Sequence, residues 1–460
     1  MNVKLDDYKN KTIHFIGIGG CSMSGIAMIL KNLGFTVQGS DIKHSSFTDT
    51  LDHSGIPYTI GQCAENVMNA DLIVYSAAIK PTNPEYVYGM EHQIPMLERS
   101  QMLGIISSSY HHVLCIAGCH GKTTITSMMG LITQDAALDA TVHVGGIVDY
   151  MGGGVKLGQS DIFITEACEY VKSFLTLNPN YIIINNIDDD HLDCYQNIEE
   201  IIETFEKFVS LLPADGILFA NVDDPYTRQV ADQCGHKVIT YGLRPENDYY
   251  IDHIAYNELG FPSFDVYARG QQLGHIQLNV PGSYNALNAL AAIAAATEIF
   301  HIPFSSIQTA LSAYHLAARR FEYIGEMKGM KIFHDYAHHP SEIAALMDAA
   351  SKYPHQKLYV LFQCNSYTRA KTLKEKYGKC FALADQVLVP DIYPGRDIDK
   401  GEIHATDLVD EINQNSANAK YLATFENIKE YLQKNAQAGD LLVTLGSGDV
   451  NRQQLIFLNP

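Results

Sequence analysis

Short apolar runs alternate with helix-like segments along almost the whole of this chain. Such a run is typical of a strand buried on both faces, and a helix between two of them predicts that the strands pair in parallel. These runs mark the expected strands: Thr12–Ile16, Thr36–Gly39, Leu72–Ser76, Val113–Ala117, Asp161–Glu166, Tyr181–Asn186, Gly216–Asn221, Leu358–Gln363, Gln386–Pro390 and Leu441–Gly446. The alternation therefore predicts an α/β protein whose parallel sheets are covered by helices.

The length of 460 residues corresponds to about three domains of ordinary size. Two stretches are typical of domain junctions: the polar run 107–112 and the segment 315–320, which follows an alanine-rich helical pattern. We therefore expect domains at 1–107, 108–316 and 317–460. The segment Tyr249–Val280 has short alternating runs and turn residues, which predict a small antiparallel β patch inside the central domain.

Composition and charge exclude several classes of protein. With 46% hydrophobic and 18% charged residues, the chain resembles a soluble globular protein, and its formal charge of -20 argues against nucleic-acid binding. No apolar run approaches the ~20 residues of a membrane span, so we expect no membrane insertion. The polar N-terminus is not a secretory signal. Nine cysteines without a C-x-x-C pair predict reduced thiols and a cytoplasmic location.

A glycine-bracketed loop joins the expected strand Val113–Ala117 to a helix. Its residues are Gly118, Cys119, His120, Gly121, Lys122, Thr123 and Thr124. Backbone N–H groups of such a loop can surround the phosphates of ATP, a lysine can neutralise them, and the Thr123 hydroxyl can bind Mg²⁺. A G-K-T tripeptide also occurs in ordinary strand-to-helix turns, so the loop alone favours a nucleotide site without proving one.

A second glycine loop follows the first expected strand, with Gly17, Gly19 and Gly20 before a helix. Asp41 lies close to the ~20-residue offset at which a dinucleotide fold contacts ribose. However, Ser22 occupies the third glycine position, so the fingerprint is broken. The loop can bind a diphosphate at the helix N-terminus, or it can be a tight turn that only packs strand against helix.

Polar residues follow two expected strands of the central sheet that are consecutive in the sequence. Glu166 ends one strand, and an acidic triplet with His191 follows another. Ligands gather at the carboxyl ends of strands in such sheets, so we expect Lys122, Thr123, Glu166 and His191 on one rim. Thr123 and Glu166 are oxygen ligands of the kind that Mg²⁺ prefers, and His191 could hold a second ion.

The last third of the chain carries a third group of polar residues. Asn288, on the alanine-rich helix, can read an adenine edge, or it can serve as a structural helix cap. Arg320 lies at the second junction, where a hinge could bring a cation onto phosphate. The histidines of the segment 334–342 follow a strand and can titrate near neutral pH, as amine chemistry requires.

Together these motifs resemble the Mur ligase family over essentially the whole chain. The segments that carry the resemblance are HFIGIGG (14–20), GSD (39–41), AGCHGKTT (117–124), NNIDDDHLD (185–193), PGSYNALNALAA (281–292), RRFE (319–322), DYAHHPSE (335–342) and LGSGD (445–449). The resemblance implies Rossmann-like N- and C-terminal domains around a central P-loop ATPase domain. It also implies that ATP phosphorylates the lactyl carboxylate of UDP-N-acetylmuramate, which L-alanine then attacks through its amine.

The resemblance also implies roles for individual residues. Gly17, Gly19, Gly20, Ser40, Asp41 and Ser76 would bind the UDP-sugar. Lys122, Asn288, Arg320 and Asp335 would contact ATP, while Thr123, Glu166 and His191 would hold Mg²⁺. Tyr336, His338 and Arg369 would surround the amino acid, and Lys122, His191, Arg320, His338 and Arg369 would be catalytic. A bacterial cytoplasmic enzyme, monomeric or homodimeric, is expected.

Four departures from the family pattern bear on these roles. Cys119 replaces a threonine, Cys168 an aspartate and Tyr284 a histidine, and 364–366 reads Cys-Asn-Ser in place of Pro-His-Arg or Pro-His-Thr. The altered segment 364–366 leaves open a related ligase that attaches a recycled tripeptide to the same nucleotide sugar. More distant alternatives are a nicotinamide-dependent dehydrogenase and a non-catalytic sensor of UDP-sugars.

Overall fold

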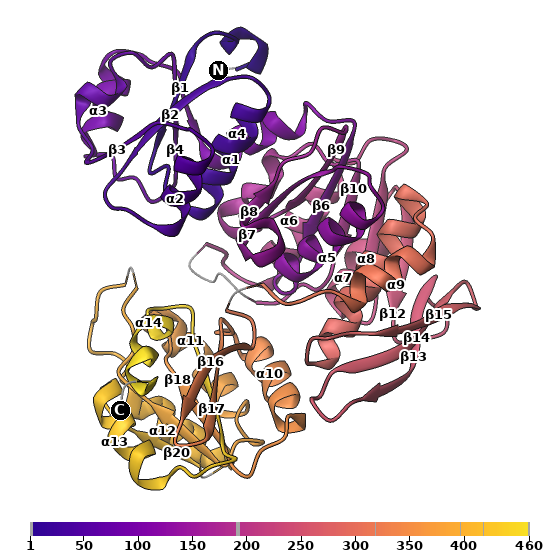
Figure 1. Ribbon diagram of the computed structural model, residues 1–460, viewed down its shortest axis with the longest axis vertical. Coiled ribbons are helices and arrows are strands. Elements are labelled where there is room, and N and C mark those ends of the chain that lie inside the picture. Colours follow the sequence, from indigo (N-terminus) through magenta and orange to yellow (C-terminus); the bar gives the residue numbers. More distant parts are fainter. Residues whose placement is uncertain (1–2, 190–193, 318, 396, 417, 459–460) are drawn as a thin grey trace.

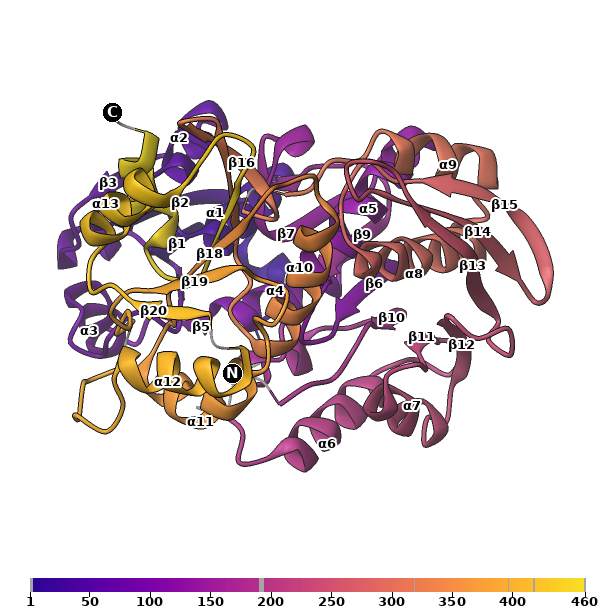
Figure 2. The same ribbon diagram turned by 90° about the horizontal axis from the view of Figure 1, so that it is seen from below.

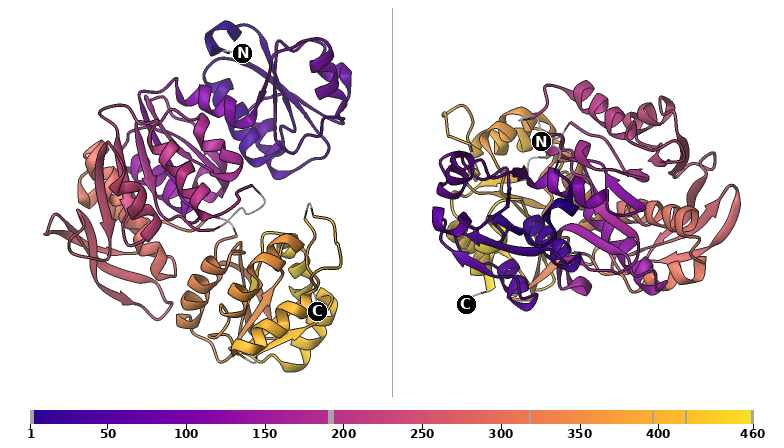
Figure 3. Two further views of the ribbon diagram at one scale, coloured as in Figure 1. Left: turned by 180° about the vertical axis from the view of Figure 1, so that it is seen from behind. Right: turned by 90° about the horizontal axis from the view of Figure 1, so that it is seen from above.

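The computed structural model describes residues 3–189, 194–317, 319–395, 397–416 and 418–458. Three sheets follow one another along the chain and form an open arc, with the central sheet between the other two (Figures 1 and 3). Each sheet is parallel over most of its width, so the predicted α/β fold class is confirmed. No helix among the described residues is both long and apolar enough to cross a membrane.

The N-terminal sheet is entirely parallel, in the order β3-β2-β1-β4-β5. Its strands are β1 (Thr12–Ile16), β2 (Thr36–Asp41), β3 (Tyr58–Ile60), β4 (Leu72–Tyr75) and β5 (Met96–Glu98). Its helices are α1 (Cys21–Asn32), α2 (Ser46–His53), α3 (Pro84–Glu91) and α4 (Arg99–Ser107). The order changes direction beside β1, so the glycine loop after β1 opens at the position where ligands bind in such sheets.

The central sheet has the order β15-β14-β13-β12-β11-β10-β6-β9-β7-β8. Its strands are β6 (His112–Ala117), β7 (Thr141–Val148), β8 (Gly153–Lys156), β9 (Ile162–Glu166), β10 (Tyr181–Ile184), β11 (Ile217–Asn221), β12 (Lys237–Gly242), β13 (Tyr249–Tyr256), β14 (Pro262–Ala268) and β15 (Gln271–Gln277). Its helices are α5 (Lys122–Asp135), α6 (Ile198–Val209), α7 (Pro225–Asp232), α8 (Ser283–Phe300) and α9 (Phe304–Ser312). The antiparallel pairing of β13, β14 and β15 confirms the predicted patch.

The C-terminal sheet has the order β16-β17-β21-β18-β19-β20, and only β16 is antiparallel to its neighbour. Its strands are β16 (Glu322–Met327), β17 (Met330–Asp335), β18 (Leu358–Phe362), β19 (Gln386–Val389), β20 (Ala419–Tyr421) and β21 (Leu441–Leu445). Its helices are α10 (Pro340–Lys352), α11 (Tyr367–Gly378), α12 (Ala405–Ser416), α13 (Phe425–Asn435) and α14 (Val450–Gln453).

Packing differs at the two junctions between the sheets. One apolar cluster runs from the N-terminal sheet into the central one, including Ile13, Met102, Val113 and Phe174. The C-terminal sheet instead buries clusters of its own on its two faces. It meets the central sheet through α10, which contacts α8 and lies at the border between the two bodies (Figure 2). The functional site lies at these junctions.

Candidate functional site

The phosphate-type loop between β6 and α5 is held in a shape that requires glycine. Gly118 has φ +128° and Gly121 has φ +87°, values that side chains rarely allow. A Cβ at Gly121 would lie 2.5 Å from Asn185 Nδ2 and 2.6 Å from Asn288 Oδ1. The His120 N–H donates to Asn186 Oδ1 (2.8 Å), which ties the loop to the segment after β10. The loop is therefore preorganised for a ligand at the N-terminus of α5.

Lys122 begins α5 and is held within the loop. Its Nζ donates to the carbonyl oxygens of Gly118 (2.5 Å) and Cys119 (3.2 Å), and to both carboxylate oxygens of Glu169 (3.1 and 2.9 Å). Burial alone would lower the pKa of this ammonium, but the charge and hydrogen bond of Glu169, together with the neighbouring thiols of Cys168 and Cys119, raise its pKa above the ordinary value. Lys122 is therefore a fixed cation at the base of the loop.

Thr123 and Glu166 lie next to each other beside Lys122. Burial raises the pKa of the Glu166 carboxyl, while hydrogen bonds from the Gly145 N–H (2.8 Å) and the Thr123 side chain oppose that shift. A buried carboxylate beside a hydroxyl offers the hard oxygen ligands that Mg²⁺ prefers. The donors therefore fit such an ion. The predicted third ligand, His191, lies outside the described residues.

A cavity of about 190 Å³ opens between α8 and α10, beside the phosphate-type loop. Asn288 lines it, and its amide accepts from Asn185 Nδ2 (3.0 Å) and donates to Asn285 Oδ1 (3.0 Å). Asp335 lines the opposite side, where burial raises the pKa of its carboxyl to about 6. The predicted ATP residues His120, Gly121, Thr124 and Arg320 also line the cavity. The cavity joins two sheets around a space next to the loop.

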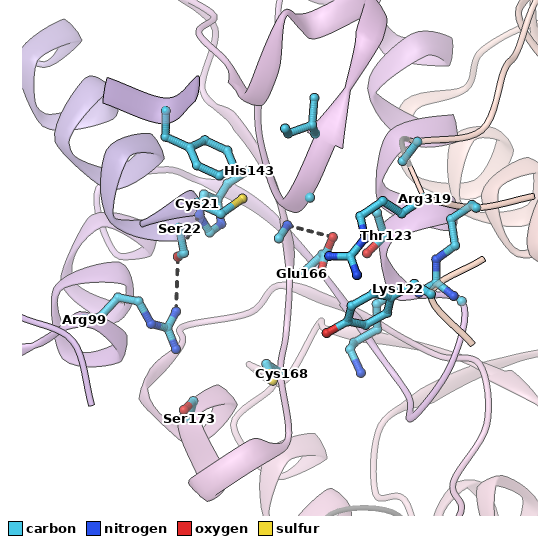
Figure 4. A pocket seen from close by; sticks show the side chains of 18 of the residues that line it. Cys21, Ser22, Arg99, Lys122, Thr123, His143, Glu166, Cys168, Ser173 and Arg319 are labelled. Carbon is cyan, nitrogen blue, oxygen red and sulfur yellow. Dashed lines mark hydrogen bonds between the residues drawn. The ribbon is translucent and has the colours of Figure 1, made fainter. Parts of the chain in front are cut away.

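A larger cavity of about 720 Å³ is lined by residues from the N-terminal, central and C-terminal parts of the chain (Figure 4). Lys122, Thr123 and Glu166 lie on its central wall, and Arg320, Tyr336 and His338 come from the C-terminal side. The structure thus brings these six predicted residues to one space. Arg369, on α11, does not line this cavity as the described residues define it.

Sequence reasoning missed several residues that line the larger cavity. Arg99 donates to Ser22 Oγ (3.2 Å), and Ser22 Oγ contacts His143 Nε2 (3.1 Å) (Figure 4). Burial, assisted by the charge of Arg99, lowers the pKa of His143 to about 4, so this imidazole is neutral near pH 7. The cavity therefore reaches the helix that follows the first glycine loop. Only the broken fingerprint at Ser22 hinted at this contact.

Sequence reasoning placed Arg319 with Arg320 at the second junction but predicted only Arg320 as a site residue. Its guanidinium stacks 4.6 Å from the Tyr336 ring centroid and lines the same cavity. Its Nε and one terminal nitrogen are buried without a hydrogen-bond partner among the described residues. Burial lowers the pKa of this group, yet a guanidinium stays charged at physiological pH. These donors suit a bound anion.

The residues expected to bind the UDP-sugar surround the loop after β1. Gly17 has φ +81°, and the Gly19 N–H donates to Asp41 Oδ2 (2.8 Å). Ser40 is buried and its hydroxyl donates to Glu85 (2.6 Å), so only its backbone faces the loop, accepting from Gly17 (2.8 Å). Two further expected residues lie at this loop: Gly20, the N-cap of α1, and Ser76, beside Gly17.

The altered segment 364–366 lies at the carboxyl end of β18. Ser366 has φ +81°, and its hydroxyl accepts from the Arg369 N–H (3.1 Å), which caps α11. Asn365 Nδ2 donates to Ser447 Oγ (2.7 Å). Cys364 is buried. The segment therefore builds the local loop and positions the start of the helix that carries Arg369.

A polar cluster joins the phosphate-type loop to α10. It contains His120, Asp188 and His339, whose ligand atoms are close enough together to hold a metal ion, and the hydroxyl of Ser341 lies among them. Histidines beside a carboxylate also occur in clusters that hold no metal ion and only stabilise the fold. Sequence reasoning placed His120 in the loop but did not pair it with the C-terminal segment.

Comparison with known proteins gives concordant results along the chain. Sequence models match residues 12–111 (Mur ligase family, catalytic domain), 116–296 (Mur ligase middle domain) and 319–448 (Mur ligase, glutamate ligase domain). A UDP-N-acetylmuramate–L-alanine ligase of Alkaliphilus metalliredigens is 44% identical over 446 residues, covering 97% of this chain and 96% of the relative.

Solved structures agree with the sequence comparison. A UDP-N-acetylmuramate–alanine ligase from Thermotoga maritima superposes with a TM-score of 0.80 at 25% identity, covering 97% of this chain and 98% of that one. A murein peptide ligase from Psychrobacter arcticus has the same fold, with a TM-score of 0.71 at 24% identity and coverage of 98% and 99%.

Proposed function

The chain belongs to the Mur ligase family, and from this premise we propose that it joins L-alanine to the lactyl carboxylate of UDP-N-acetylmuramate in an ATP-dependent step of peptidoglycan precursor synthesis. The observation that supports the proposal is the convergence of Lys122, Thr123, Glu166 and Arg320 on one cavity, which the N-terminal, central and C-terminal bodies share. The near-full-length similarity to alanine-adding relatives supports the choice of amino acid.

The proposed reaction has two steps. The lactyl carboxylate attacks the γ-phosphorus of ATP and ADP leaves, which gives an acyl phosphate. The amine of L-alanine then attacks the carbonyl carbon, inorganic phosphate leaves, and the amine loses a proton as the amide forms. Lys122 and Arg320 would stabilise the charge on the transferred phosphoryl oxygens, because both are cations on the wall of a partly enclosed cavity.

The remaining site residues take roles that follow from their positions. Asn288 and Asp335 would hold the adenine and ribose in the smaller cavity. Tyr336 and His338 would orient the amino acid, because both line the larger cavity. Arg369 would reach the substrate only if the C-terminal body closes further than it does here. Domain boundaries at 107/108 and 316/317 fit these roles.

Thr123 and Glu166 would hold Mg²⁺, which would supply positive charge to compensate the charge of the phosphates. His191 completes this proposed set from sequence resemblance alone. At the other end of the cavity, the loop of Gly17, Gly19 and Gly20 would receive the UDP diphosphate on the N-terminus of α1. Asp41 braces that loop through Gly19.

Release of ADP in the presence of UDP-N-acetylmuramate, ATP and Mg²⁺ tests the proposal. We expect release to depend on L-alanine and to be much slower with the tripeptide or with no amino acid. Faster turnover with the tripeptide would favour the tripeptide ligase. A rate of ADP release that does not depend on UDP-N-acetylmuramate would refute both ligase activities. A Lys122→Ala variant should lose ligation while it keeps its affinity for the UDP-sugar, because the glycine loop proposed to bind the UDP-sugar follows β1 of the N-terminal sheet.

A further inference from the structure

One hydroxyl joins the central body to the C-terminal body. Ser341, in the first turn of α10, donates to Asp188 Oδ2 (2.6 Å). Ser341 Oγ also lies 2.8 Å from His120 Nε2 and 2.8 Å from His339 Nδ1. A serine hydroxyl can donate one hydrogen bond and accept two, so these three contacts use its full capacity.

These contacts cross the border between two sheets. His120 belongs to the phosphate-type loop and Asp188 to the segment after β10, whereas Ser341 and His339 belong to the C-terminal body. Glu342, next to Ser341, adds a second bridge, with its Oε1 3.3 Å from His120 Nδ1. His120 is therefore held from two sides by the start of α10.

The bridged residues are also walls of the smaller cavity. His120 and Gly121 line it from the central body, and Ser341, Glu342 and Ala345 line it from α10. The space exists only while α10 is docked on the loop, because one side belongs to each body. Docking and formation of the proposed nucleotide pocket are thus one event.

We propose that Ser341 is a positioning residue: its hydroxyl docks α10 onto His120 and Asp188 and so shapes the pocket that receives ATP. The proposal rests on the proposed function for the identity of the nucleotide. Ser341 itself is an exposed residue, so its removal leaves no buried void and should not unfold the chain. Its effect should appear in ATP affinity, while the UDP-sugar loop on the N-terminal sheet is untouched.

A metal ion held by His120, Asp188 and His339 is the competing account of the same cluster. We favour the hydroxyl because it already lies within hydrogen-bond distance of an atom of each of these three side chains. The two accounts differ in whether removal of a metal ion weakens the junction between α10 and the phosphate-type loop. A chelator that captures Zn²⁺ but spares Mg²⁺ should leave a hydroxyl-based junction unchanged.

The test compares Ser341→Ala and Ser341→Thr in the ADP-release assay with the full chain. We expect Ser341→Ala to raise the KM for ATP on the order of tenfold, with KM for UDP-N-acetylmuramate and the melting temperature unchanged. Ser341→Thr keeps the hydroxyl and should recover most of the ATP affinity. Ser351→Ala, at the other end of α10, is the matched control, because among the described residues its hydroxyl donates only to the Asp348 carbonyl oxygen, within the same helix (2.8 Å).

The outcomes separate the possibilities. An unchanged KM for ATP in Ser341→Ala overturns the proposal, as does an equal rise for both substrates with a lower melting temperature, which would mean a general structural defect. If a Zn²⁺ chelator alone raises the wild-type KM for ATP to that of Ser341→Ala, the junction is a metal site instead. Absence of ADP release from the wild type itself would count against the proposed function and not against the docking contact.

Discussion

The ion pair of Lys122 with Glu169 allows folding and catalysis to be tested separately. The side chains are only 14% and 1% exposed, so loss of the ammonium leaves a buried carboxylate without its cation. Breaking a buried pair from one side typically costs about 3–5 kcal/mol. We expect Lys122→Met to lower the free energy of unfolding by about 3 kcal/mol, the lower end of this range, because the lysine is not fully buried. For a unit of roughly 200 residues this corresponds to a fall in melting temperature of about 6–12 °C.

The double variant Lys122→Met/Glu169→Gln removes the charge from both partners. Because the uncompensated carboxylate is gone, we expect it to regain at least half of the lost melting temperature. ADP release should nevertheless stay roughly 100-fold or more below wild type, because no cation is left at the base of the loop. Lys172→Met is the matched control, since the side chains of the Lys172–Glu200 pair (2.7 Å) are 42% and 26% exposed, so the loss of this pair should lower the melting temperature much less.

Differential scanning fluorimetry and the ADP-release assay give the two readouts on the same preparations. Two results would refute the reasoning. An unchanged melting temperature in Lys122→Met would mean that Glu169 is not a buried, dependent partner. Recovery of ADP release together with stability in the double variant would mean that Lys122 serves folding and not phosphoryl transfer.

Two further predictions concern the loop and the buried imidazole. Gly121→Ala should weaken ATP binding by roughly tenfold or more, because its Cβ would meet Asn185 and Asn288; Gly152→Ala, with φ +65° but open space, isolates the backbone cost. Isothermal titration with ATP checks this, and equal effects of the two variants would contradict it. His143 has a folded pKa of about 4, below its ordinary value of about 6.5, so stability is lost as pH falls through this window. From pH 7 to 5 the wild type should lose about 2 kcal/mol more unfolding free energy than His143→Gln in urea titrations, and parallel losses would disprove it.

The strands that sequence reasoning located are those with a continuous apolar run. β1, β9 and β18 are buried along nearly their whole length, so their composition alone marks them. β3 and β5 have 3 residues each, too few for a pattern, and their pairing with longer neighbours defines them. β7 contains two glycines, and its pairing with β8 has a register shift, so a strand there depends on the sheet already being present.

The same distinction applies to the candidate site. Lys122, Thr123 and Glu166 lie on one cavity because they are at the carboxyl ends of two neighbouring parallel strands, β6 and β9. Ligands bind at this edge of such sheets, so the residues could be predicted from the positions of the strands in the sequence. Glu169 and Arg99 could not be found in this way. Each is a single charged residue whose significance comes from a partner distant in sequence, such as Lys122, 47 residues away from Glu169.

The charge of the chain shows why such local contacts decide binding. A formal charge of -20 would repel two substrates that each carry phosphates. The cavity reverses this field locally, because five cations line it beside two carboxyl groups: Arg99, Lys122, Arg319, Arg320 and Arg452 against Glu166 and Glu342. These cations come from the N-terminal, central and C-terminal bodies, so no single body holds the full set. Anion binding therefore favours the arrangement in which the bodies are docked, and substrate binding and closure must reinforce each other.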